Sequence, residues 1–363
     1  MSNKLHIIVV GTDPASYRGG IASALPGYFR ALEYAGISNE FIPTHHATAR
    51  GGKWRYWVFA FPKIAHSIYH SRNEWGGVVV YAHVGGGIPS FVRKSMLALF
   101  VRLLGVPVVM HLHGPEVARY LATPWRKFFF RMALVPASAV CVLTSWWKDI
   151  LQAAKIDKPV NIVPNPLDEQ CEMTALTPVE RNETKDSLTV VSMARIENGK
   201  GVDVLIEAVP LLPGNVYVVV AGNGAQLSKL KKRVRDLSID QRVQFLGWVE
   251  GEDKLRLLKN ADIFCLPSCH DSFGMGFVEA MAYGLPVIAL DWGPIHDVVP
   301  DGECGILINQ PDPKHLANEI ANLSENVELR KRMGKNGQHW VYQQFGVHKV
   351  GEKLRMVMEE VCN

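Results

Sequence analysis

The chain has 363 residues, of which 48% are hydrophobic and 20% are charged, and its formal net charge is +4. This composition excludes a disordered or fibrous protein, and the length favours two domains over a single hydrophobic core. The six cysteines form no paired Cys-x-x-Cys pattern, so we expect free thiols in a reducing compartment.

The longest apolar stretch, residues 96–110, is interrupted by Arg102. A membrane-spanning helix needs roughly 18 to 20 uninterrupted apolar residues, so no transmembrane helix is expected. The first twelve residues, MSNKLHIIVVGT, are typical of a buried strand rather than of a signal peptide. We therefore expect a cytoplasmic protein.

Short apolar runs alternate with longer helical patterns along the chain. Apolar strands separated by helices are typical of parallel sheets covered on both faces, so the fold class is α/β with two Rossmann-like domains. The predicted strands are residues 5–10, 78–81, 106–112, 139–143, 188–193, 216–221, 243–245, 263–266 and 286–290.

A segment rich in Pro, Asn, Thr and charge, without apolar periodicity, indicates a linker near the middle of the chain. We place the first domain at residues 1–165, the linker at 166–187 and the second domain at 188–346. A helical pattern follows at residues 347–361.

A glycine pair, Gly19 and Gly20, lies between the first strand and a helical run. Backbone N–H groups at such a helix start can face an anion or an acceptor hydroxyl. A plain tight turn is the alternative interpretation.

Positive charge is concentrated in the first part of the chain. Residues 1–160 carry 18 Lys and Arg against 7 Asp and Glu, a net +11, whereas residues 161–363 carry 21 against 28, a net −7. Cations interleaved with aromatics suit a membrane interface with anionic headgroups. A solvated basic face is the alternative, and no recognisable module supports nucleic-acid binding. The residues that we expect to contact membrane or acceptor are Lys53, Trp54, Arg55, Arg93, Lys94, Arg126 and Lys127.

Two histidines, His111 and His113, end a buried strand of the first domain. We expect their imidazoles to point to opposite sides of the strand, so that at most one faces a ligand. His113 is nearer the strand end and is the candidate, whereas His111 is interpreted as a hydrogen-bonded core histidine.

The second domain opens with a strand and a loop that carries Arg195 and Lys200. These two fixed cations lie where a leaving nucleoside diphosphate would develop negative charge. Ordinary surface cations on a loop are the alternative.

A later strand is followed by two acidic residues, Asp271 and Glu279, with seven residues between them. Small residues and a helix start lie in this interval, and both suit phosphate oxygens and sugar hydroxyls. An ordinary strand-to-helix turn is the alternative. Cys269 and His270 beside Asp271 are too few to close a metal site, so no metal is predicted. The loop residues of this candidate donor cradle are Ser272, Phe273, Gly274, Met275 and Gly276.

The acidic-x7-acidic segment resembles the signature of the retaining glycosyltransferases of family four. Members of that family have the GT-B fold, in which the parallel sheets of two Rossmann-like domains face an interdomain cleft. The family usually has Glu at both ends of the signature, so Asp271 is a departure that sets the first carboxylate back.

The resemblance implies roles for the candidate residues. Arg195 and Lys200 match the pair that holds the diphosphate, and His113 matches the histidine that contacts the transferred sugar. Asp271 would orient sugar hydroxyls, and Glu279 matches the acid that holds the ribose hydroxyls.

Three further positions follow from the same resemblance. Gly222 lies in a turn near the nucleotide, and Gly247 with Trp248 lies in the stretch whose backbone contacts the base. The loop of Gly19 and Gly20 would face the donor phosphate and the acceptor, and the C-terminal helix would pack back on the first domain.

The implied activity is retaining, metal-independent transfer of a sugar from a UDP- or GDP-sugar to an acceptor. The nucleotide sugar is a substrate, so no cofactor is expected, and the chain has no Asp-x-Asp metal motif. The charge asymmetry favours a lipid-linked saccharide acceptor in bacterial surface polysaccharide assembly, with the protein peripheral on the inner face of the cell membrane.

Three other functions remain open. A nucleotide-sugar epimerase or hydrolase would need no acceptor, and a dinucleotide oxidoreductase would need a Gly-x-Gly-x-x-Gly motif, which we do not find. A non-catalytic, membrane-associated nucleotide-sugar-binding protein is favoured by Asp271 but disfavoured by Arg195, Lys200 and Glu279.

Overall fold

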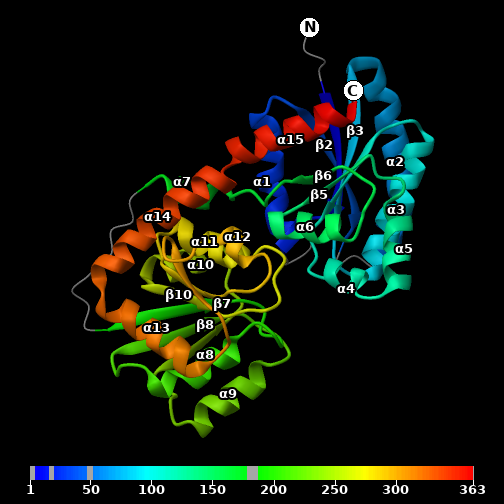
Figure 1. Cartoon of the computed structure of the whole chain (residues 1–363). Helices are drawn as coiled ribbons and strands as arrows, with labels where there is room; N and C mark the ends of the chain where they lie inside the picture. Colours follow the sequence, from blue (N-terminus) through cyan, green and yellow to red (C-terminus); the bar gives the residue numbers. More distant parts are fainter. Residues whose placement is uncertain (1–4, 16–19, 47–51, 178–186, 363) are drawn as a thin grey trace. The chain divides into compact units, whose positions relative to one another are not determined.

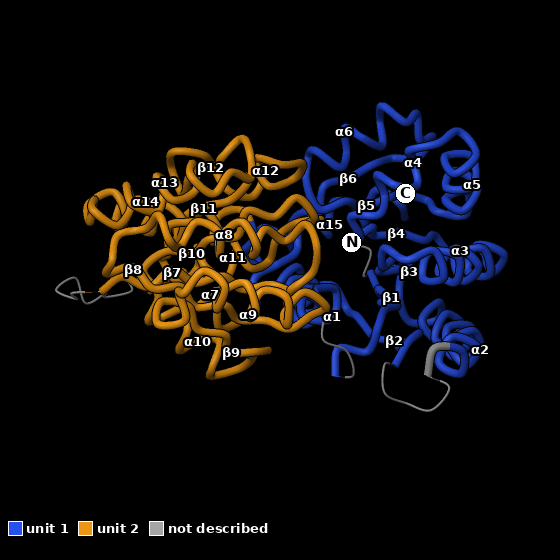
Figure 2. Tube along the Cα trace, turned by 90° about the horizontal axis from the view of Figure 1, so that it is seen from below, with its two compact units in different colours: residues 1–168, 345–363 blue, residues 169–344 orange. Residues whose placement is uncertain are grey.

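The computed structural model describes residues 5–15, 20–46, 52–177 and 187–362. The chain divides into two compact units, the first made of Met1–Asp168 with Phe345–Asn363 and the second of Glu169–Gln344 (Figure 2). No described helix has the length and hydrophobicity to cross a membrane.

The first unit is built on a six-stranded parallel sheet with the order β2-β1-β3-β4-β5-β6. Its strands are β1 (Leu5–Thr12), β2 (Ser38–His45), β3 (Gly77–Val84), β4 (Val108–Leu112), β5 (Ala139–Val142) and β6 (Val160–Ile162). Its helices are α1 (Gly20–Tyr34), α2 (Gly52–Glu74), α3 (Ile88–Leu103), α4 (Val117–Leu121), α5 (Pro124–Leu134), α6 (Ser145–Ala153) and α15 (Val347–Cys362).

The second unit has a six-stranded parallel sheet with the order β12-β11-β10-β7-β8-β9. Its strands are β7 (Leu188–Met193), β8 (Val216–Ala221), β9 (Val243–Gly247), β10 (Ile263–Leu266), β11 (Val287–Leu290) and β12 (Gly305–Ile308). Its helices are α7 (Glu169–Ala175), α8 (Val202–Ala208), α9 (Leu227–Asp236), α10 (Gly251–Asn260), α11 (Met275–Ala282), α12 (Ile295–Val298), α13 (Pro313–Glu325) and α14 (Val327–Phe345), with a 3-10 turn at Val209–Leu211.

These two sheets confirm the predicted fold class. The first seven residues of β1 are buried, as expected for a strand covered on both faces. In the first unit α1 and α15 lie on one side of the sheet and α2, α3 and α5 on the other (Figure 1). Right-handed crossover connections explain this division. The chain moves in one direction across the sheet from β1 to β2 and in the opposite direction from β2 through β6, so the connecting helices fall on opposite faces.

The C-terminal helix α15 belongs to the first unit. Its Val350 and Leu354 pack in one core with Tyr28 and Leu32 of α1. A Cβ added at Gly351 would lie 2.5 Å from the Ala31 carbonyl oxygen, so glycine permits the close approach of these two helices.

The first boundary between the units differs in detail from the predicted linker at residues 166–187. The first unit extends to Asp168, and α7 within the linker range packs with the second unit. Gln338 donates hydrogen bonds to the carbonyl oxygens of Thr174 (3.0 Å) and Ala282 (3.3 Å), which ties α7 to α11 and α14. Part of the predicted linker, residues 178–186, lies outside the described residues.

Candidate active site

The loops after β7 and β10 meet at the carboxyl edge of the second sheet, because the two strands are parallel neighbours. The Cys269 N–H donates to the Gly199 carbonyl oxygen at 2.8 Å, and the Ser268 hydroxyl donates to the same oxygen at 3.2 Å. Gly201 has φ +75°, and a Cβ there would lie 2.2 Å from the Pro267 carbonyl oxygen. Glycine at this position therefore permits the two loops to touch.

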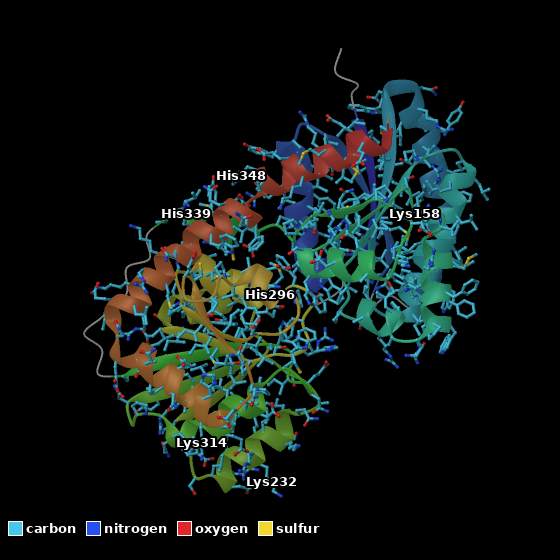
Figure 3. All side chains as sticks on the ribbon, in the orientation of Figure 1. Lys158, Lys232, His296, Lys314, His339 and His348 are labelled. Carbon is cyan, nitrogen blue, oxygen red and sulfur yellow. The ribbon has the colours of Figure 1, made fainter. Side chains whose placement is uncertain are left out.

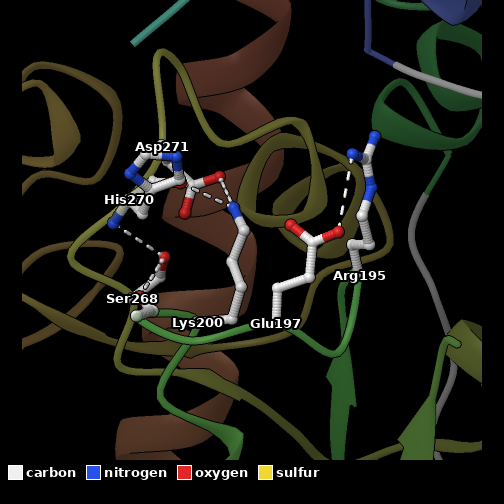
Figure 4. A network of polar contacts seen from close by, with 7 residues as sticks. Arg195, Glu197, Lys200, Ser268, His270 and Asp271 are labelled. Atoms are coloured by element: carbon white, nitrogen blue, oxygen red, sulfur yellow. Dashed lines mark hydrogen bonds and ion pairs between the residues drawn. The ribbon is translucent and has the colours of Figure 1, made fainter. Parts of the chain in front are cut away.

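A partly buried ion pair joins these loops (Figure 4). Lys200 Nζ lies 2.7 Å from Asp271 Oδ1 and also donates to the His270 carbonyl oxygen at 2.7 Å. Both side chains are only 15% exposed. Asp271 Oδ2 is buried and has no hydrogen-bond partner among the described residues. One oxygen of this carboxylate thus holds Lys200, and the other can accept a hydroxyl hydrogen bond.

Arg195 stands apart from that pair in Figure 4. Its Nη1 lies 3.7 Å from Glu197 Oε1, and both side chains are about half exposed. This solvent-screened contact leaves the guanidinium available to an incoming anion, since exposed ion pairs of this kind contribute about 0–1 kcal/mol. The two predicted phosphate-binding cations therefore have different surroundings.

The loop from Ser272 to Gly276 leads into α11, as predicted. Gly274 is the N-cap of α11, with φ +84°, and Met275 and Gly276 form its first turn. Phe273 is only 1% exposed. Its side chain belongs to the core, so only its backbone can contribute to the predicted donor cradle.

Glu279 lies one turn further along α11 and pairs with a residue that the sequence did not indicate. Lys254 Nζ of α10 is 3.0 Å from Glu279 Oε1, and the two side chains are 20% and 12% exposed. No local motif connects residues 25 positions apart, so this partner is identified only by the structure.

The remaining predicted donor-binding positions lie at the ends of β8 and β9. The Gly222 N–H donates to the Gly247 carbonyl oxygen at 2.6 Å. A Cβ on Gly222 would lie 1.8 Å from the Ala194 carbonyl oxygen, so this turn rests on the loop after β7. Trp248 is 41% exposed, and its indole N–H donates to Glu250 Oε2 at 3.2 Å. These positions share one edge of the sheet with Lys200 and Asp271.

The expectation that His111 and His113 face opposite ways is wrong. Side chains two residues apart share a face of a strand, and the two ring centroids lie 4.1 Å apart. A third histidine on β3, His83, joins them, with Nδ1 2.8 Å from His113 Nε2. His111 Nδ1 lies 2.5 Å from the Tyr81 hydroxyl, in agreement with its interpretation as a hydrogen-bonded core residue.

Burial keeps this histidine cluster neutral. It lowers the pKa of His113 to about 3, with an opposing contribution from a hydrogen bond with Asn165. The pKa values of His83 and His111 are also lowered, chiefly by burial and secondly by His113. Neutral imidazoles donate or accept single hydrogen bonds, so His113 is suited to holding a hydroxyl rather than to proton transfer near pH 7.

Among the described residues, these three histidines form the one group whose spacing could suit a metal ion. One ring nitrogen of each lies within 4.8 Å of the others. Two nitrogens on one tetrahedral zinc lie roughly 3.3 Å apart. The 2.8 Å separation between His83 and His113 is instead a hydrogen-bond length. These rings would have to move apart to bind a metal.

The glycine loops of the first unit include one that the sequence analysis missed. Gly20 begins α1, whereas Gly19 lies outside the described residues. The missed loop, residues 85–87, follows β3, and a Cβ on Gly114 would lie 2.1 Å from Gly86 Cα. The sequence signal that could have indicated this loop is the run of three glycines directly after an apolar segment.

The predicted basic and aromatic residues are mostly at the surface, with one exception. Trp54 and Arg55 on α2 are exposed, and the Arg93 guanidinium lies 6.0 Å from the Trp54 ring centroid. Arg126 stacks on Trp125 at 5.0 Å, and Lys127 is half-buried. The side chain of Lys53 lies outside the described part of the chain.

Lys94 is the exception, because it does not lie at the surface as the predicted membrane contact requires. It is 5% exposed and donates a hydrogen bond to the Thr44 hydroxyl. Burial, with a smaller contribution from Arg93, lowers the pKa of Lys94 to about 7. Because it lies on the inner side of α3, its ammonium cannot reach a membrane.

Two family models match the chain. The model described as Glycosyltransferase Family 4 matches residues 89–170, and the model described as Glycosyl transferases group 1 matches residues 176–340. Their junction falls close to the boundary between the two units.

Curated relatives match over different shares of their length. N-acetyl-alpha-D-glucosaminyl L-malate synthase of Bacillus anthracis is 25% identical over 290 residues, covering 77% of this chain and 74% of the relative. The lipopolysaccharide core biosynthesis glycosyltransferase LpsE of Rhizobium meliloti is 33% identical over 160 residues, covering 44% of this chain and 46% of the relative.

Solved structures share the whole architecture. Anabaena Alr3699/HepE in complex with UDP and glucose is 19% identical with a TM-score of 0.73, covering 98% of this chain and 99% of that one. A glycosyltransferase from Rickettsia africae is 17% identical with a TM-score of 0.77, covering 99% of each chain.

Two parallel six-stranded sheets with alternating helices, together with these structural relatives, define a protein of the GT-B class. The matches to both family models then place the chain among the glycosyltransferases of family four.

Proposed function

We propose that this glycosyltransferase moves a sugar, with retention of configuration, from a nucleoside-diphosphate donor bound at the carboxyl edge of the second sheet. The arrangement of Lys200 and Asp271 is the observation that carries this proposal. It sets an ammonium group beside a carboxylate whose second oxygen is buried without a partner among the described residues. Because a sugar diphosphate offers both an anion and hydroxyl donors, it satisfies both groups.

The proposed reaction breaks the bond between the anomeric carbon and the diphosphate oxygen, whose electron pair leaves with the diphosphate. Lys200 and Arg195 neutralise that developing charge. The acceptor oxygen attacks from the same face, and its proton passes to a phosphate oxygen. Asp271 Oδ2 accepts a hydrogen bond from a sugar hydroxyl, and neutral His113 holds another. Side-chain cations supply the positive charge in this scheme, so we propose that no metal is needed.

For the donor we propose a UDP-sugar. The solved complex of Anabaena Alr3699/HepE holds UDP and glucose, and its fold spans this whole chain. In the proposed pose, Glu279 binds the ribose hydroxyls, and the backbone near Gly247 and Trp248 contacts the base. The turn at Gly222 and the start of α11 surround the diphosphate.

For the acceptor we propose a lipid-linked saccharide presented at an anionic membrane, consistent with the name of the relative LpsE as a lipopolysaccharide core biosynthesis glycosyltransferase. We define the apolar-basic face as the exposed surface of α2, α3 and α5. These helices are neighbours, since α3 contacts both α2 and α5. Exposed apolar side chains on neighbouring helices are typical of a contact site, and cations among aromatics suit anionic headgroups. Its exposed apolar residues are Trp54, Val58, Phe59, Val92, Met96, Leu99, Trp125, Phe128, Phe129 and Met132, and its cations are Arg55, Arg93, Arg126 and Lys127.

Substitution of the two cations tests the proposed donor site. Lys200→Ala and Arg195→Ala should each lower kcat by about 10²-fold or more, because each removes charge stabilisation of the leaving diphosphate. Product formation from a panel of UDP-sugars and a lipid-linked acceptor is the measurement. Lys314→Ala, which removes an exposed lysine of α13 (Figure 3), is the matched control and should retain full turnover. Near-normal turnover in both site variants would contradict the assignment.

A further inference from the structure

A pocket of about 520 Å³ lies at the end of the first unit opposite to its histidine cluster. It lies between α5 and the segment Ile156–Lys158. Leu134 and Lys158 come shortly before the first residues of β5 and β6, which places the pocket at the amino edge of the sheet. His113 follows β4 at the carboxyl edge. The pocket is therefore separate from the residues proposed to hold the sugar.

The lining of the pocket is basic. It includes Lys127, Arg131 and Lys158 against the single carboxylate of Asp157, a net charge of +2. Arg131 Nη2 lies 2.5 Å from Asp157 Oδ2, with side-chain exposures of 42% and 80%. This exposed pair holds Arg131 weakly, so a stronger anion can compete for the guanidinium.

Among the three cations of the pocket, Lys158 has the surroundings least favourable to a positive charge. Its Nζ donates to the Val135 carbonyl oxygen at 2.8 Å, which fixes the ammonium beside the end of α5. Partial burial lowers the pKa of Lys158, and repulsion from Arg102 lowers it further, while Asp157 opposes the shift. A second anion near Lys158 would relieve both effects.

Apolar side chains surround these cations. Phe128, Met132 and Val135 line the pocket and are 59%, 54% and 57% exposed. Phe129 on the same helix is 63% exposed, and Leu103 at the end of α3 is 79% exposed. A free phosphate would use only the cations, whereas a molecule with an anionic head and hydrocarbon chains would cover both surfaces.

We propose that this pocket binds the phosphate headgroup of an anionic phospholipid, with the acyl chains against Phe128, Met132 and Val135. This inference rests on the membrane contact proposed for the apolar-basic face and adds a specific lipid site to it. Lys158 and Arg131 bind the phosphate oxygens, and α5 supplies the apolar rim. The lipid is thus a membrane component that docks the enzyme, distinct from the acceptor.

The test uses the full-length chain and short-chain phosphatidylglycerol below its micelle concentration, with affinity measured by calorimetry. Lys158→Ala and Arg131→Ala should each weaken binding about tenfold or more, because each removes one of the two cations that bind the phosphate oxygens. Lys158→Arg should restore most of the affinity. Lys155→Ala, which removes an exposed lysine outside the pocket lining and outside the apolar-basic face, should change the affinity less than about twofold, because an exposed charge that does not line the pocket contributes little.

Three results would overturn the proposal. One is an equal loss of affinity in Lys158→Ala and Lys155→Ala, which would indicate diffuse electrostatic attraction. Another is unchanged affinity in both pocket variants while circular dichroism shows the native fold. A third is inorganic phosphate displacing the lipid at equal concentration, which would make the pocket a site for a free anion.

Vesicle flotation separates this proposal from the membrane contact on which it rests. Wild-type protein should float with phosphatidylcholine vesicles that contain phosphatidylglycerol and not with pure phosphatidylcholine, and Lys232→Ala (Figure 3) should behave like wild type. Phe129→Ser should weaken flotation and leave binding of the soluble lipid intact. Flotation without soluble-lipid binding would remove the pocket and keep the membrane contact, whereas failure to float on anionic vesicles would remove both.

Discussion

At the scale of single residues, buried ionisable groups are what the sequence described least well. Lys94 lies in a run of cations and aromatics that indicates a surface, yet it is buried against Thr44. His83 lies within an apolar run and carries no motif, yet it contacts His113. Which face of a helix or strand points inward depends on packing against distant segments, so these contacts required the structure. The sequence neighbours of a polar residue therefore do not show which side chains it contacts in the folded chain.

The neutral state of His113 predicts a specific dependence of stability on pH. Its folded pKa of about 3 lies below the ordinary value of 6.5, so the unfolded chain binds more protons between these values and stability rises with pH. The contribution is complete above about pH 6.5 and is lost as the pH falls toward 3. In urea unfolding of the whole chain, His113→Asn should flatten this dependence by about 1.4 kcal/mol per pH unit between pH 4 and 6.

The matched control for that measurement is His339→Asn, which replaces an exposed histidine of α14 (Figure 3). It should leave the slope as in the wild type, because its side chain is solvated in the folded chain. Equal slopes in wild type and His113→Asn would mean that the folded chain tolerates a charged imidazole at this position.

At the scale of helices and strands, the sequence predicted the central strands of both sheets but missed three edge strands. The unpredicted strands are β2, β6 and β12, and each lies at the edge of its sheet. An edge strand is less covered and needs no continuous apolar run, as the sequence of β2, SNEFIPTH, illustrates. The loops of Lys200 and Asp271 could be predicted because they follow the central strands β7 and β10. The pairing of Lys200 with Asp271 was not, since 71 positions separate them.

Contact between the loops after β7 and β10 makes a second prediction at this scale. Gly201→Ala should destabilise the chain and weaken UDP binding, because the Cβ would meet the Pro267 carbonyl oxygen and displace Lys200 from Asp271. The left-handed backbone alone should cost about 1–2 kcal/mol. Gly214→Ala is the matched control, since no atom lies within 4 Å of the added Cβ. Thermal melts with and without UDP measure both effects, and a wild-type UDP shift in Gly201→Ala would contradict the proposed role of this loop contact.

At the scale of the whole molecule, each unit carries its own set of polar groups at the carboxyl edge of its sheet. Parallel sheets place every loop that follows a strand at one edge, which is why ligands bind there in open α/β folds. The first unit offers neutral imidazoles and a glycine loop, and the second offers cations and carboxylates. The unit with fixed cations is the one suited to a diphosphate, and the neutral one is suited to hydroxyl groups.

This division predicts how the enzyme responds to metal removal. If Lys200 and Arg195 neutralise the leaving group, turnover should survive dialysis against EDTA with less than about a twofold change, because no catalytic charge is removed. Turnover before and after dialysis, with metal content checked by elemental analysis, is the measurement. Loss of activity that zinc or manganese restores would contradict the metal-independent scheme. The residues to substitute next would then be His83, His111 and His113. Among the described residues, their ring nitrogens are close enough together to hold a metal ion.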